Sequence, residues 1–132
     1  MTSIPIADAK ALDTYIDGWK QGDGLIIHSV QADDYRLTGV PGIPVVHRHE
    51  FVNFFSAFRA QIADAGGPQV QSEQFMQIHG QIRRIIGDVT VESALFIVPG
   101  FGSGTYMAAA KNGEVIWEEA VMLSIPLELT AG

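Results

Sequence analysis

The chain has 132 residues, of which 47% are hydrophobic and 17% are charged, and its formal net charge at pH 7 is −7. This length suits one globular domain, and no apolar run approaches the roughly 20 residues that a membrane-spanning helix needs. The acidic charge disfavours nucleic acid as a partner, and the absence of cysteine excludes disulfides and thiolate chemistry.

The first thirty residues predict two helices and no targeting segment. Residues 1–5 show no basic stretch followed by an apolar run, so we expect no signal peptide and a cytoplasmic location. A helix over residues 7–21 is predicted because large apolar side chains recur at helical spacing: Leu12, Tyr15, Ile16 and Trp19. Gly22 suits the left-handed position that ends a helix, and Asp23 can cap a second helix over residues 25–30.

The middle of the chain predicts a strand, a loop and a third helix. Residues 35–38 indicate a short strand, and the glycines and prolines of residues 39–44 break it into a loop. From about His49 one helical face carries Phe51, Phe54, Phe55, Phe58 and Ile62. Gly66-Gly67-Pro68 ends this helix.

The last half of the chain changes from helical to alternating periodicity. Turn residues divide it into four expected strands, at about residues 74–86, 90–98, 104–111 and 114–127. Short connections of this kind predict an antiparallel meander, so the chain is expected to be an α+β protein with its helices first.

This order of elements, together with Tyr15-x-x-x-Trp19-x-x-Gly22-Asp23 and Ala32-Asp33-Asp34, resembles the nuclear transport factor 2-like superfamily of SnoaL-like and ketosteroid-isomerase-like proteins. The resemblance covers residues 1–132 as a single domain. It implies a cystatin-like fold in which a cone-shaped, curved antiparallel sheet wraps around three N-terminal helices and encloses an apolar pocket. Because such proteins include isomerases, dehydratases, hydrolases, cyclases and proteins without catalysis, function must be argued from the site.

Tyr15 lies where ketosteroid isomerases place the tyrosine of their oxyanion hole, and a buried phenol can donate a hydrogen bond to developing negative charge. The general base of that family would fall at Gly39 or Val40, and its second acid at Thr105. None of these three residues is an acid, so ketosteroid isomerase activity is expected to be absent. The alternative is a structural tyrosine with a satisfied hydroxyl group.

His79 resembles the strand histidine that acts as a base in scytalone-dehydratase-like proteins. Lys20 occupies the place of the aspartate that orients that base, and the glutamates that could replace it are Glu73, Glu92, Glu118 and Glu119. Alternation along one strand puts His79 on the same face as Phe75, Gln77, Gln81 and Arg83, and the resemblance points this face into the cone. Otherwise His79 binds ligand or satisfies the core without catalysing a reaction.

Successive strand residues point to opposite faces, so one of Glu118 and Glu119 faces inward. The resemblance favours Glu118, whose carboxyl group in an apolar cavity would have a raised pKa and could act as an acid or a base. A salt bridge or a position at the rim is the alternative. The opposite face then carries an apolar row expected to form a homodimer through the outer sheet face: Trp117, Val121, Leu123 and Ile125.

His47-Arg48-His49-Glu50 contains metal-binding residue types. Because the pair runs into a helix, the side chains of the two histidines diverge by roughly 200°, so no metal site is expected. His49 could instead overhang the mouth of the pocket. No cofactor is expected.

The sequence thus favours a cofactor-free lyase, isomerase or cyclase that acts on a small hydrophobic metabolite, with His79, Tyr15 and Glu118 as catalytic candidates. The candidate substrate contacts are Trp19, Phe54, Phe58, Phe75, Phe96, Met122 and His49. The alternative is a non-catalytic ligand-binding or dimerisation module of the same fold. An enzyme predicts at least two ionisable groups converging on the cavity, whereas a binding module predicts at most one.

Overall fold

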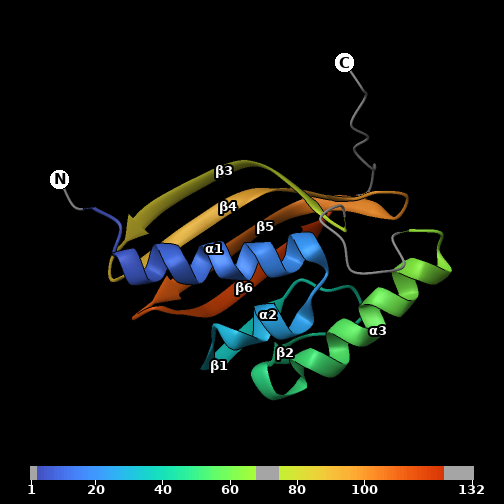
Figure 1. Cartoon of the computed structure of the whole chain (residues 1–132), viewed down its shortest axis with the longest axis horizontal. Helices are drawn as coiled ribbons and strands as arrows, with labels where there is room; N and C mark the ends of the chain where they lie inside the picture. The colour runs from blue at the N-terminus through green and yellow to red at the C-terminus, as the bar shows by residue number, and fades with distance from the viewer. Residues whose placement is uncertain (1–2, 68–74, 124–132) are drawn as a thin grey trace.

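The computed structural model describes residues 3–67 and 75–123. Helix α1 spans Ile6–Gln21, α2 spans Gly24–Ser29 and α3 spans Phe51–Asp64, with a short 3₁₀ turn, η1, at Arg48–Glu50 before α3. The strands are β1 (Gln31–Thr38), β2 (Val46–His47), β3 (Gln77–Ile86), β4 (Val89–Val98), β5 (Gly102–Lys111) and β6 (Glu114–Met122). Figure 1 shows the three helices on one side of a curved sheet.

The predicted helix boundary after α1 is confirmed. Gly22 takes φ 69° and its backbone N–H bonds back to the last turn of α1. A side chain at Gly22 would also run into the ring of Phe75, so both the backbone and the packing require glycine. The Asp23 carboxylate accepts hydrogen bonds from the backbone amides of Leu25 and Ile26 in the first turn of α2.

The six strands form one sheet in the order β2-β1-β6-β5-β4-β3. Strands β3 to β6 pair antiparallel in chain order, so the predicted meander is confirmed. Strand β1 adds to β6 in parallel, which makes the sheet mixed rather than wholly antiparallel. The last predicted strand extends to residue 127, whereas β6 ends at Met122, and residues 124–127 lie outside the described part.

Strand β1 is longer than predicted, because it begins at Gln31 and not at Tyr35. Asp33 and Asp34 are exposed strand residues beside an irregularity in the pairing with β6. Tyr35 and Leu37 point into the core. The extra length matters because it brings the Tyr35 side chain into the interior beside α1.

Helix α1 lies across the concave face of the sheet and forms the core with it (Figure 1). Tyr15 is completely buried and Trp19 is 7% exposed. Trp19 is surrounded by the aromatic rings of α3, which meet it mostly edge to face: Phe51, Phe55 and Phe58. No helix in the described ranges is long and apolar enough to cross a bilayer.

Candidate functional site

A buried cluster of two phenols and one carboxyl group lies between α1 and the sheet. The hydroxyl group of Tyr15 donates a hydrogen bond to Oε1 of Glu118, and the hydroxyl oxygens of Tyr15 and Tyr35 are 2.6 Å apart. Because the Tyr15 proton is used on Glu118, Tyr35 is the donor to Tyr15. Glu118 is 6% exposed and both tyrosines are fully buried. The predicted inward orientation of Glu118 is confirmed, and Glu119 is exposed on the opposite face.

Burial raises the pKa of Glu118 to about 7, and the negative charge of Glu92 adds to the rise. The hydrogen bond from Tyr15 and the nearby indole of Trp19 oppose it. The pKa of Tyr15 is raised well above its usual value by burial and by the Glu118 charge, so this phenol keeps its proton. Glu118 is therefore a carboxyl group that both accepts and releases a proton near neutral pH, next to a permanent donor.

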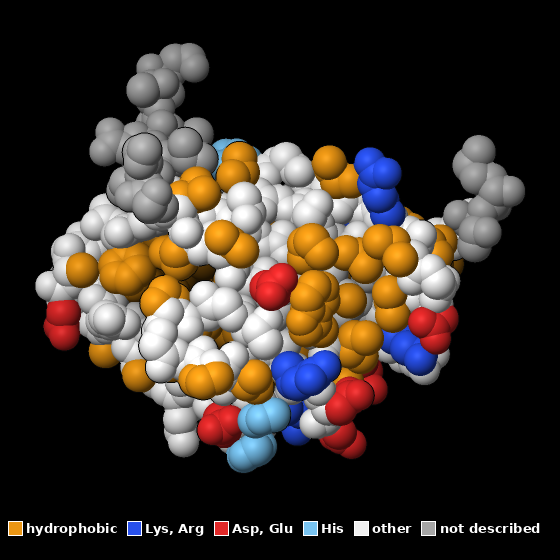
Figure 2. Space-filling model, turned by 180° about the vertical axis from the view of Figure 1, so that it is seen from behind, with side chains coloured by type: hydrophobic (Ala, Val, Ile, Leu, Met, Phe, Trp, Pro, Cys, Tyr) orange, Lys and Arg blue, Asp and Glu red, His pale blue; other side chains and the backbone are white. Residues whose placement is uncertain are grey.

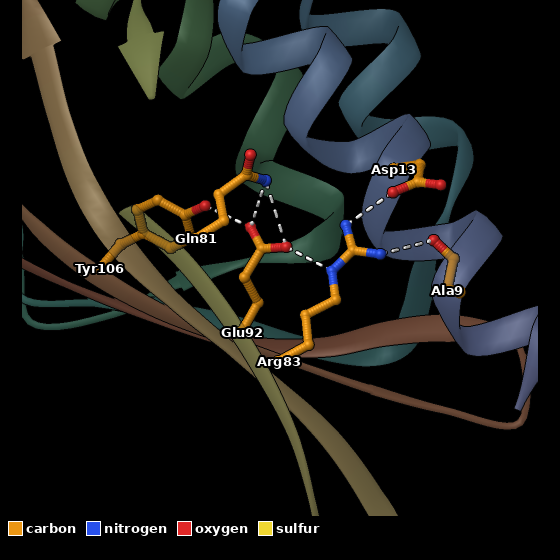
Figure 3. A network of polar contacts seen from close by, with 6 residues as sticks. All are labelled: Ala9, Asp13, Gln81, Arg83, Glu92 and Tyr106. Atoms are coloured by element: carbon orange, nitrogen blue, oxygen red, sulfur yellow. Dashed lines mark hydrogen bonds and ion pairs between the residues drawn. The ribbon is translucent and has the colours of Figure 1, made fainter. Parts of the chain in front are cut away.

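A second buried carboxylate, Glu92, is held by three neighbouring side chains (Figure 3). Nε of Arg83 lies 2.6 Å from Glu92 Oε1, and the hydroxyl group of Tyr106 donates to Oε2. Gln81 adds two longer contacts of 3.4 Å, and Arg83 reaches on to Asp13 at 2.6 Å on α1. Glu92 is fully buried, and its charge is compensated within this network.

The two carboxyl groups lie in one row across the sheet. Glu92 pairs with Ala108 and Ala108 pairs with Glu118, so all three side chains point to the same inner face. Two strand spacings separate the backbones of the glutamates by about 10 Å. The charge of Glu92 consequently acts on Glu118 through the apolar interior, which is the second cause of the raised pKa.

Next to this cluster is an apolar cavity of about 190 Å³ between α3, β1, β6 and the β4–β5 connection. A hollow edged by hydrophobic side chains is visible on the left of Figure 2. The residues that line it include Trp19, Leu37, Val40, Pro41, Phe54, Phe58, Gln61, Met76, Phe96, Phe101, Ala120 and Met122. Among the described residues the lining contains no ionisable side chain.

Five of the predicted substrate contacts line the cavity: Trp19, Phe54, Phe58, Phe96 and Met122. Two others lie elsewhere. Phe75 is fully buried in the core against Phe55, and His49 is exposed, stacked on His47 with ring centroids 5.8 Å apart. His49 is held away from the cavity because residues 47–50 form the entry to α3, in which the Glu50 carboxylate accepts from the His47 backbone at 3.1 Å.

The prediction that His79 projects into the cone is wrong. A β-bulge between His79 and Ile82 leaves Gly80, with φ 70°, and Gln81 opposite a single residue of β4. Residues before the bulge therefore lie on the face opposite to the one that regular alternation predicts. Gln81 and Arg83 point inward to Glu92, whereas His79 pairs with Leu95 and is exposed. No carboxylate orients its ring among the described residues, and its neighbour is Gln77 at 3.4 Å.

Sequence reasoning missed Tyr35, the second phenol of the cluster. Tyr35 alternates with Leu37, but a predicted strand of only four residues, 35–38, does not assign a face to either residue, whereas β1 spans Gln31–Thr38. It also missed Val40 and Phe101, which line the cavity from connections between strands, where periodicity carries no signal. Within residues 3–67 and 75–123, no group of three or more histidines and acids could hold a metal ion.

No protein-family model and no curated protein matches the sequence. Many solved structures resemble the fold. An NTF2-like protein with a cystatin-like fold from Novosphingobium aromaticivorans matches with TM-score 0.63 and 13% identity over 89% of this chain and 82% of that one. TerC, co-crystallised with polyporic acid, matches with TM-score 0.64 and 15% identity over 89% and 92%.

A protein from Sinorhizobium meliloti described as a "putative polyketide cyclase" matches with TM-score 0.59 and 15% identity, over 89% of this chain and 94% of that one. At these identities the likeness concerns the fold. The chain thus has the NTF2-like, cystatin-like fold that its sequence predicts.

Proposed function

We propose that the chain binds a small apolar ring compound in the cavity beside Trp19. The observation that supports this is the composition of the lining, which is aromatic and aliphatic apart from Gln61. Apolar pockets with few polar groups are the usual form of small-molecule sites. By the criterion that separates an enzyme from a binding module, a lining without ionisable side chains favours the binding module.

The size of the cavity limits the ligand. A closed apolar cavity of about 150 Å³ holds one benzene molecule. A cavity of about 190 Å³ therefore fits a substituted single ring, and a larger ligand would have to extend through the mouth. This also argues against a four-ring steroid, in agreement with the expected absence of ketosteroid isomerase activity.

The solved structure of TerC supports the proposal by analogy, because a protein of this fold was co-crystallised with polyporic acid. The analogy rests on fold alone. The chemistry of the ligand of the present chain must come from its own lining residues.

The binding proposal is testable by nuclear magnetic resonance, because the chain has only two tryptophans. Trp19 lines the cavity and Trp117 lies on the outer sheet face. Adding toluene should move the indole N–H signal of Trp19 and leave that of Trp117 unchanged, with Trp117→Phe providing the assignment. No shift of the Trp19 signal at saturating toluene would refute the proposal.

A variant that fills the cavity can be compared with a matched variant on the protein surface. Ala120→Leu adds three carbons inside the cavity, whereas Ala60→Leu adds the same carbons on the exposed face of α3. Because the added side chain occupies ligand space, Ala120→Leu should weaken toluene binding by about tenfold or more. Ala60→Leu should bind as the parent does. Equal affinities of both variants would place the ligand elsewhere.

Acid–base catalysis is a second candidate function, favoured by the pKa of about 7 at Glu118 and by the hydrogen bond from Tyr15. In such a cofactor-free isomerase, lyase or cyclase, Glu118 would move a proton of a small ring ketone while Tyr15 stabilises the oxyanion. Glu118 is not among the residues that line the cavity, which is why this function ranks second.

Exchange of the methyl protons of acetophenone in D₂O tests catalysis without knowledge of the substrate. An enolising enzyme should accelerate this exchange by at least about a hundredfold over Glu118→Gln. Identical exchange rates for the parent and this variant would remove the catalytic candidate and leave the binding function.

We also propose that the outer sheet face forms a homodimer. The face carries Trp117 and Leu123 together with two exposed apolar residues, Met107 at 42% and Val121 at 53%. Ile125, predicted to continue the row, lies outside the described residues. An exposed apolar surface of this kind is commonly covered by a partner.

A further inference from the structure

The cavity passes from a buried floor to an exposed rim. Its floor consists of four side chains that are at most 7% exposed: Trp19, Leu37, Met76 and Phe96. Three lining residues are exposed and therefore border the opening: Gly39, Pro41 and Gln61. A ligand that enters through the hollow seen in Figure 2 would place its most apolar part at the floor and its other end at the rim.

Gln61 carries the only amide, hydroxyl or charged side-chain group among the described lining residues. Phe54, Phe58 and Gln61 lie at positions i, i+4 and i+7 of α3, so they share one face of the helix. Side chains of a helix lean toward its N-terminus, so the long side chain of Gln61 leans back over the preceding turn, which carries Phe58. The amide group consequently borders the part of the cavity that the Phe58 ring lines.

The Phe58 ring connects the floor with the rim. It meets Trp19 at the floor with ring centroids 6.2 Å apart, and it meets Phe101 of the β4–β5 connection with centroids 6.1 Å apart. Gln61 follows Phe58 by three residues, a rise of about 4.5 Å along the helix axis. A single ring packed against Phe58 can therefore bring a directly attached polar atom to the Gln61 amide.

The chemistry of the Gln61 amide limits that polar atom. Within the described part of the chain the Gln61 side chain makes no hydrogen bond, so both of its polar atoms are open to a ligand. Nε2 donates and Oε1 accepts, and a hydroxyl group can use both because it also accepts and donates. A charged substituent does not fit, because no opposite charge in the described lining would replace the water that an ion loses. The net charge of −7 disfavours an anion further.

Resting on the binding function proposed above, we propose that the ligand is a neutral single-ring phenol. Its ring packs against Trp19 and Phe58, and its hydroxyl group hydrogen-bonds to the Gln61 amide at the rim. Gln61 is then the residue that determines specificity, because it favours a hydroxylated ring over a hydrocarbon ring of the same size.

Two probes of equal size measure this preference. p-Cresol and p-xylene have the same number of heavy atoms and differ in a hydroxyl group against a methyl group. At pH 7 p-cresol is neutral, because the pKa of a phenol is about 10. Calorimetric titrations give the ratio of the p-cresol affinity to the p-xylene affinity. This ratio should fall about two- to tenfold in Gln61→Met, which keeps the length of the side chain and removes the amide.

A control variant and two further measurements complete the test. Gln21 ends α1, is half-buried and is not among the lining residues, so Gln21→Met should leave the ratio unchanged. In the parent protein p-cresol should move the side-chain amide signals of Gln61 in nuclear magnetic resonance spectra further than p-xylene does, a comparison that needs no variant. 4-Methylbenzoate should bind at least about tenfold more weakly than p-cresol, because its charge finds no partner.

The outcomes separate the two proposals. An equal ratio in the parent and Gln61→Met, with p-xylene bound by both, would overturn the inference and leave the binding function standing. Binding of 4-methylbenzoate as tight as that of p-cresol would likewise overturn the neutral phenol. If none of the three probes binds the parent protein, the proposed function and the inference fail together.

Discussion

Replacing Glu118 by glutamine should stabilise the protein above pH 7 and have little effect near pH 5. Glutamine keeps an oxygen that accepts the Tyr15 hydroxyl and removes the buried charge. The pKa of Glu118 is about 7 in the folded protein and 4.5 when unperturbed. The native state therefore binds its proton more tightly than the unfolded chain does, and the free energy of unfolding falls as the pH rises from 4.5 through about 7.

The magnitude follows from the two pKa values. Each pH unit between them corresponds to about 1.4 kcal/mol, so ionisation of Glu118 costs the parent protein about 3 kcal/mol of stability at high pH. Relaxation of the surroundings will reduce this value, and an increase of about 1 to 3 kcal/mol in Glu118→Gln at pH 8 is expected.

Urea unfolding from pH 5 to pH 8.5 measures the effect as the difference between variant and parent. Groups such as Asp88, whose pKa is lowered by Lys111, contribute equally to both proteins and cancel. Glu119→Gln is the matched control, because its side chain is exposed on the opposite face and should give a difference that does not vary with pH. A Glu118→Gln difference that is independent of pH, or a loss of stability at pH 8, would refute the reasoning.

Three further predictions concern the sheet. Arg83→Met should lower the free energy of unfolding in urea by about 3 to 5 kcal/mol, because it leaves the Glu92 charge buried without its cation. Adding Glu92→Leu should restore much of this stability, and additive effects of the two substitutions would contradict the pairing. Gly80→Ala should cost about 1 to 2 kcal/mol because the bulge holds φ at 70°, and unchanged stability would show that the bulge is absent. Val121→Arg should convert a dimer to a monomer in light scattering, and a monomeric parent protein at micromolar concentration would refute the dimer.

Much of the architecture was predictable from the sequence because local chemistry determines it. Gly22 and Asp23 mark the junction of α1 and α2 by backbone and capping requirements that hold wherever a helix ends. The inward orientation of Glu118 followed from strand alternation, which holds as long as the pairing register is regular.

The face of His79 was not predictable in the same way, because one extra residue in a strand reverses every side chain before it. Gly80 was the only local sign of the bulge, and a glycine inside a strand does not by itself fix a register. The Tyr15–Tyr35–Glu118 cluster was out of reach for a related reason. It joins residues separated by 20 and 103 positions, and only the parallel pairing of β1 with β6 brings them together.

Labelling the methionine methyl groups with ¹³C tests most directly whether the cavity binds a ring compound. Met76 and Met122 line the cavity, whereas Met107 is exposed on the outer face and serves as an internal control. With toluene bound, nuclear Overhauser effects from its ring protons should reach the methyl groups of Met76 and Met122 and not that of Met107. Contacts to Met107 alone, or to none of the three, would contradict the proposed binding site.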